Sequence, residues 1–166
     1  MHLDLDVEAL KQLDPLSILT KIITIFPSIE PKRSEVYTIL AELCSNALDH
    51  GILRLDSSLK SSISGMSTYY EDRSKRLAAL TDGFIRIDIE LITNETDPTE
   101  QALSITVEDS GPGFSYQKKV EDLQNSHEIN LRKLSGRGLS LMSSLCRSVE
   151  YRGCGNHVTV VYAWNT

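Results

Sequence analysis

Cysteine is scarce in this chain of 166 residues. Only three are present, and they form no CxxC pair: Cys44, Cys146 and Cys154. An odd number at irregular spacing predicts neither a disulfide framework nor a zinc site. Free thiols fit a reducing compartment, so we expect a cytoplasmic protein.

Long apolar runs and an excess of positive charge are also missing. No window approaches the roughly 18 consecutive apolar residues that span a bilayer, and the opening MHLDLDVEAL has neither the basic nor the apolar part of a secretion signal. The chain carries 17 Lys and Arg against 23 Asp and Glu, a formal charge of -6. Nucleic-acid and anionic-membrane surfaces usually depend on clustered Lys and Arg, so we expect no nucleic acid and no membrane as partner. A nucleotide needs only local donors and is not excluded.

The length and composition describe one ordinary globular domain. A chain of 166 residues can bury roughly two-thirds of its unfolded surface around a single core. The 40% hydrophobic and 24% charged contents exclude a disordered or fibrous class. We therefore predict one domain over residues 1–166, which could also be a module of a longer protein.

The spacing of apolar residues predicts an α+β fold. Segments of helical period cover residues 15–26, 31–51, 69–80 and 138–146. Alternating segments predict strands over 2–7, 83–92, 101–109, 148–153 and 156–164, and the Ser-rich stretch 55–67 is predicted to be a loop. We expect a two-layer α/β sandwich with helices on one face of a mixed or antiparallel sheet.

Capping residues place the ends of the first two long helices. Asp14 followed by Pro15 is a typical start for the first. For the second, Ser34 is the predicted cap and Gly51 the predicted end.

The segment AELCSNALDHG, residues 41–51, carries polar residues on an otherwise apolar helix. At about 100° per residue, Glu42, Asn46 and Asp49 fall within roughly 60° of one another, beside the apolar stripe. His50 follows at the end of the helix. Each of these residues could equally be a solvated or capping side chain, so the stripe alone does not indicate a site.

The segment VEDSGPGF, residues 107–114, places a carboxylate and two glycines directly after a strand. Gly111 and Gly113 allow a tight turn and let a flat ligand approach the backbone. Asp109 could accept a hydrogen bond from an exocyclic amine. A plain tight turn after an edge strand would look the same.

The segment SGRGLSLM, residues 135–142, is a Gly-rich turn that opens a helix. Free N–H groups and the positive end of the helix dipole suit phosphate oxygens at such a place. The chain has neither GxGxxG nor GxxxxGK[ST], so the dinucleotide and P-loop signatures do not apply. An ordinary loop-to-helix junction remains the alternative.

The order of the three segments is informative where each alone is not. ExxxNAxxHG on a helix, DxGxG after a strand and GxGL opening a helix resemble the nucleotide-binding boxes of the GHKL superfamily of ATPases, over residues 34–162. The wording NALDHG and SGRGLSLM is most similar to the serine kinases that act as anti-sigma factors. ALDHG, LDSSLK and YY also resemble the ATPase modules of response-regulator proteins that carry a serine phosphatase domain.

The resemblance implies ATP and Mg2+ as cofactors and gives each matching residue a role. Asn46 would be the Mg2+ ligand, Glu42 the base that polarises the attacking hydroxyl, and Asp109 the acceptor of the adenine amine. Asp49 and His50 close the first box; His50 could contact phosphate or merely end the helix. The remaining residues implied in nucleotide binding are Gly111, Gly113, Gly136, Arg137, Gly138 and Leu139.

The chain departs from the family pattern at two places. Leu134 stands where members often have an Arg before the Ser-Gly pair, so we expect Arg137 to meet the γ-phosphate, with Lys133 and Arg132 as alternatives. Near adenine, Asn156 follows the last glycine where members often have Thr.

The functions implied by the resemblance fall into different classes. The leading one is a protein serine kinase whose substrate is a STAS-type anti-sigma-factor antagonist, with a sigma factor as a further candidate partner. The second is a nucleotide-dependent binding module that sequesters its partner without phosphotransfer. The catalytic half of a histidine kinase is disfavoured, because no helical hairpin carries a phosphoacceptor histidine. An exposed first strand would also permit a homodimer.

Overall fold

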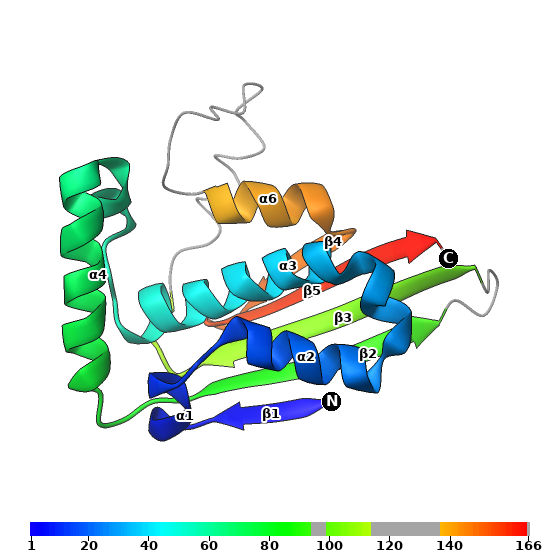
Figure 1. Cartoon of the computed structure of the whole chain (residues 1–166), viewed down its shortest axis with the longest axis horizontal. Coiled ribbons are helices and arrows are strands. Elements are labelled where there is room, and N and C mark those ends of the chain that lie inside the picture. Colours follow the sequence, from blue (N-terminus) through cyan, green and yellow to red (C-terminus); the bar gives the residue numbers. More distant parts are fainter. Residues whose placement is uncertain (94–98, 114–136, 166) are drawn as a thin grey trace.

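The computed structural model describes residues 1–93, 99–113 and 137–165. These parts form one antiparallel sheet with helices packed over one of its faces (Figure 1). The strands are β1 (His2–Leu5), β2 (Ile85–Thr93), β3 (Glu100–Asp109), β4 (Ser148–Arg152) and β5 (His157–Asn165). The α-helices are α1 (Val7–Lys11), α2 (Pro15–Ile25), α3 (Arg33–Ser45), α4 (Ile63–Ala78) and α6 (Arg137–Leu145).

The strands follow the order β1-β2-β3-β5-β4 across the sheet. Each pairing among the described strands is antiparallel, including the predicted hairpin of β2 with β3. The predicted α+β class with helices on one face is therefore confirmed, and the mixed sheet that the sequence also allowed is wrong. β1 and β4 are the two edges of the sheet.

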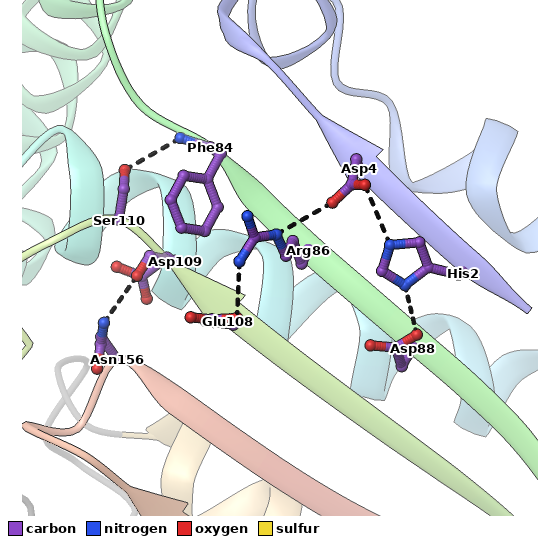
Figure 2. Close-up of polar contacts among 9 residues, drawn as sticks. All are labelled: His2, Asp4, Phe84, Arg86, Asp88, Glu108, Asp109, Ser110 and Asn156. Carbon is purple, nitrogen blue, oxygen red and sulfur yellow. Dashed lines mark hydrogen bonds and ion pairs between the residues drawn. The ribbon is translucent and has the colours of Figure 1, made fainter.

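The two faces of the sheet differ in polarity. In β2, Ile85, Ile87 and Ile89 are buried against the helices, whereas the residues between them are exposed. The exposed face carries a polar network in which Arg86 donates to Asp4 of β1 and to Glu108 of β3 (Figure 2). This arrangement is typical of an antiparallel sheet with one face in water.

The core lies between the inner face of the sheet and the helices α2, α3 and α6. On α3 the apolar stripe is fully enclosed, since Val36 and Leu40 are 0% exposed and Leu43 is 1% exposed. Met142 of α6 is buried as well. No helix in the described part of the chain is long and apolar enough to cross a membrane.

The start of α2 is as predicted, and the start of α3 is not. The Asp14 side chain accepts the Leu16 N–H, 3.1 Å away, with Pro15 in the first turn. The 3-10 helix η1 (Pro27–Lys32) runs directly into α3, and its last turn satisfies the Arg33 N–H through the Glu30 carbonyl. Ser34 therefore lies inside the helix, and its predicted role as the cap is wrong.

The helix that carries NALDHG changes form at Asn46. After α3 the chain continues as a π-helix, η2 (Asn46–Ile52), closed by a bond of 2.8 Å from the Leu53 N–H to the Leu48 carbonyl. The predicted end at Gly51 is therefore slightly early.

The Ser-rich stretch forms helices instead of the predicted loop. A 3-10 helix, η3 (Ser57–Ser61), is capped by the Asp56 side chain, which accepts the Ser58 N–H at 2.8 Å. Ser62 then caps α4 by accepting the Gly65 N–H at 3.1 Å. α4 stands upright at one end of the helical layer, beside the end of α3 (Figure 1).

Candidate functional site

The end of η2 touches the loop that follows β3. A Cβ on Gly51 would lie 2.5 Å from Oδ1 of Asp109, and a Cβ on Gly111 would collide with the Gly51 carbonyl. Only two glycines allow backbones to come this close. The first and second sequence motifs therefore meet in the folded chain.

Asp109 is a buried carboxylate at this junction, with 7% of its surface exposed. Its Oδ1 accepts the Gly111 N–H at 2.8 Å. Burial raises the pKa of its carboxyl to about 6, with a further increase from Glu108, while the Gly111 N–H acts in the opposite direction. Among the described residues no donor contacts Oδ2, so an acceptor is available for a ligand amine.

Asn156, in the turn between β4 and β5, fixes the backbone of Asp109. Its Nδ2 donates to the Asp109 carbonyl at 2.8 Å, and its own carbonyl accepts the Asp109 N–H at 2.9 Å (Figure 2). In the sequence, Asn156 stands out only as a departure from the family pattern. The position of an amide side chain directly after the glycines of a turn was the feature of the sequence that could have predicted this contact.

The second glycine of the loop rests on the turn between β4 and β5. Gly113 has a φ of 74°, and a Cβ there would collide with the Cys154 carbonyl. The position therefore demands glycine both by conformation and by space. The loop is thus held between η2 on one side and the β4–β5 turn on the other.

The third motif meets the first through Glu42. A Cβ on Gly138, in the first turn of α6, would collide with Oε2 of Glu42. The half-buried Glu42 carboxylate thus lies at the amino-terminal end of α6. The N–H groups and the dipole at the start of a helix attract anions, phosphates included.

Asp49 is turned to a different set of partners. It is 5% exposed and accepts from Ser45 Oγ at 3.1 Å, Tyr69 OH at 2.9 Å and Arg73 Nε at 2.8 Å. The contacts with Tyr69 and Arg73 bind it to α4, and the sequence does not indicate them because these two residues are distant in the chain. Nucleotide binding by Asp49 stays a prediction, and the observed contacts indicate a structural role.

His50 also contacts protein. Its Nδ1 lies 3.0 Å from the Leu55 carbonyl, just beyond the end of η2. This contact matches the helix-closing alternative considered for His50. Phosphate binding by His50 stays a prediction.

Comparison with protein families agrees with the convergence of these motifs. The family model described as the histidine kinase-like ATPase domain matches residues 16–162. The chain belongs to this family. A search among curated proteins found no match. Membership supports ATP binding by a kinase-like ATPase domain of the GHKL superfamily, and it accounts for the order of the three motifs.

The part of this ATPase domain that the structure describes fits a nucleotide with its metal ion. Asp109 offers a carboxylate oxygen for an amine, and the first turn of α6 lies beside Glu42, where a helix start suits phosphate oxygens. No group of three or more His, Cys, Asp or Glu in the described ranges could hold a metal by itself. Mg2+ is commonly held by one or two protein oxygens together with phosphates, so a single amide ligand such as Asn46 is compatible with it.

Asn46 lies close to Glu42 along the helix. It is half-buried at the start of η2, one helical turn after Glu42, and its N–H bonds to the Glu42 carbonyl. Its role as the Mg2+ ligand stays a prediction.

Several predicted phosphate contacts cannot be placed. Gly136, and the alternative cations Lys133 and Arg132, lie outside the described residues. Arg137 and Leu139 belong to the first turn of α6, but their side chains are not described. Which cation meets the γ-phosphate stays a prediction.

Proposed function

We propose that this ATPase domain is a protein serine kinase that phosphorylates a small STAS-type anti-sigma-factor antagonist in bacterial partner switching. The observation that supports phosphotransfer most directly is the position of Glu42. Its carboxylate lies at the start of α6, where phosphate oxygens would bind, one helical turn from Asn46. A base placed beside the terminal phosphate can orient and polarise an attacking hydroxyl.

The other residues bind and orient the nucleotide. Asp109 would accept from the adenine amine, and Asn46 would provide a side-chain oxygen that holds Mg2+. Bound Mg2+ would neutralise phosphate charge. The chain's own contribution is to align the γ-phosphate with Glu42 and the partner's serine hydroxyl.

The resemblance of NALDHG and SGRGLSLM to the anti-sigma-factor kinases suggests the partner. A phosphoserine adds nearly two negative charges at neutral pH, which is enough to disrupt a packed interface. Phosphorylation would thereby release the partner, leaving this domain free to hold a sigma factor. Such a protein acts in the cytoplasm, and the edge strand β1 offers a surface for a homodimer.

Replacement of the base separates binding from transfer. Glu42→Ala should retain Mg-ATP binding by calorimetry and lose phosphorylation of the partner's serine, measured by phosphopeptide mapping. Glu71→Ala, which removes an exposed carboxylate on α4, is the matched control and should phosphorylate normally. Unchanged phosphotransfer by Glu42→Ala would remove Glu42 from the role of base.

The alternative is a nucleotide-dependent binding module without phosphotransfer. Its support is the outer surface of α4, where Ile63, Met66 and Tyr70 are 93%, 44% and 58% exposed at helical spacing. Exposed apolar side chains of this kind often contact a partner protein. Release of ADP and a phosphorylated partner would favour the kinase, whereas ATP-dependent capture of an unmodified partner would favour the binding module.

A further inference from the structure

The π-helix η2 sets the geometry between two parts of the candidate nucleotide site. It begins at Asn46, the predicted Mg2+ ligand, and near its end Gly51 packs against Asp109, the predicted adenine acceptor. π-Helices are rare and frequently occur at functional sites. A relaxation of η2 to an α-helix would turn Gly51 relative to Asn46 and separate it from Asp109.

A partly buried ion pair between α4 and η2 holds η2 in place. Arg73 of α4 reaches the Asp49 carboxylate with an Nε–Oδ1 distance of 2.8 Å, and the two side chains are 31% and 7% exposed. Tyr69, one turn earlier on α4, donates to the other oxygen of Asp49 at 2.9 Å. The middle of η2 is therefore fixed to α4 by charged hydrogen bonds.

A second arginine of α4 holds the chain just after η2. Nη1 of Arg76 donates to the Leu53 carbonyl at 2.9 Å and to the Arg54 carbonyl at 3.0 Å. Arg54 has a φ of 53°, a conformation that costs energy for a residue with a side chain. The contacts of Arg76 favour the turn that ends η2.

We propose that Arg73 and Arg76 are positioning residues of the nucleotide site, which together clamp η2 in its π-helical form. They touch neither the predicted metal ligand nor the adenine acceptor, and act through Asp49 and the carbonyls of residues 53 and 54. The proposal rests on the ATP site described above. The long connection from Ile52 to Asp82 would then have a role in nucleotide binding, because α4 supplies both arginines.

The clamp predicts a specific loss in ligand binding. Without Arg73 the placement of Asn46 relaxes, so binding of Mg-ATP should weaken more than binding of ATP in EDTA. Supporting residues around metal ligands typically contribute about 10- to 100-fold to affinity, and Arg73→Ala should weaken Mg-ATP binding by about 10-fold or more. A merely structural role would lower the folded fraction and reduce both affinities equally.

The experiment measures ATP affinity by calorimetry, with Mg2+ and with EDTA, for four variants. Arg73→Ala and Arg76→Ala should lower the ratio of the affinity with Mg2+ to the affinity with EDTA. Arg73→Lys should restore part of this ratio. Lys75→Ala changes an exposed residue of the same helix and should leave the ratio unchanged. Hydrogen exchange should accelerate at the Leu53 amide, which closes η2, in the first two variants.

Two results would overturn the clamp. The first is that Arg73→Ala and Arg76→Ala both fold and keep the wild-type ratio of the affinities with Mg2+ and with EDTA. The second is that this ratio falls equally in Lys75→Ala. If Arg73→Ala does not fold, Arg76→Ala alone tests the clamp, because this substitution leaves the ion pair of the buried Asp49 intact. Failure of the wild-type chain to bind ATP at all is a different outcome and refutes the nucleotide site itself.

Discussion

Acidification should weaken ATP binding through the protonation of Asp109. Burial raises the pKa of this carboxyl from an ordinary 3.8 to about 6 in the ligand-free protein. A carboxylate accepts from the adenine amine, whereas a protonated carboxyl presents a competing hydrogen and one acceptor fewer. Binding therefore selects the ionised form, and bound adenine should lower the pKa of Asp109 again.

The size of the effect follows from the fraction of Asp109 that is ionised. With a pKa of about 6, roughly 90% is ionised at pH 7 and roughly 10% at pH 5, so affinity should fall about 10-fold between them. The effect on folding has the opposite sign. Because the folded pKa lies above the unfolded one, this group's contribution to stability is present below about pH 4 and lost as the pH rises through about 6.

A site-specific titration avoids interference from the ionisation of ATP. The 13Cγ chemical shift of Asp109, assigned by comparison with Asp109→Asn, should titrate near pH 6 in the free protein and at a lower pH with Mg-ATP bound. A midpoint near 3.8 in the free protein would refute the burial argument. A raised midpoint that nucleotide leaves unchanged would remove Asp109 from adenine binding.

Two further substitutions test the packing beneath the site. Gly111→Ala forces a Cβ against the Gly51 carbonyl, so it should lower the free energy of unfolding by about 1–3 kcal/mol and weaken ATP binding. Urea titration measures the first effect and calorimetry the second. Unchanged values in both would disprove the close approach of the two glycines. Leu40→Ala removes a side chain that is 0% exposed at the centre of α3 and should lower the free energy of unfolding by about 2–5 kcal/mol, whereas a loss below about 1 kcal/mol would place Leu40 outside the core.

Local signals were sufficient for most of the fold. Alternation identified β2 and β3 because most of their inner residues are isoleucine, leucine or valine and their outer ones are mostly polar. Asp14 and Pro15 located the start of α2, because a cap depends only on adjacent residues. Ser34 is not the cap because a preceding 3-10 helix runs directly into α3 and satisfies the Arg33 N–H.

The Ser-rich stretch shows the limit of composition as a guide. Serine favours both loops and helix caps, and here Ser62 caps a helix of 16 residues. Propensity could not distinguish the two outcomes, because α4 gains its place from distant contacts. Tyr69 and Arg73 bind Asp49, which lies 20 and 24 residues earlier in the chain. The spacing of residues in the sequence does not predict such pairs.

Spacing identified three segments that the fold brings together, but it could not give the contacts between them. The proximity of Glu42 to Gly138, and of Gly51 to Asp109, depends on how α3, η2 and α6 lie over the sheet. Asp49 illustrates the consequence, since it shares the helical stripe of Asn46 yet binds α4. Position on a helix face does not distinguish a ligand-binding carboxylate from one that holds the fold together.

The central claim is that η2, the loop after β3 and the start of α6 enclose one site for ATP and Mg2+. Calorimetric titration of the folded wild-type chain with ATP tests it most directly. The account predicts saturable binding of one ATP per chain that weakens when Mg2+ is removed with EDTA. Absence of any binding heat from ATP, with Mg2+ present and at several temperatures, would contradict it.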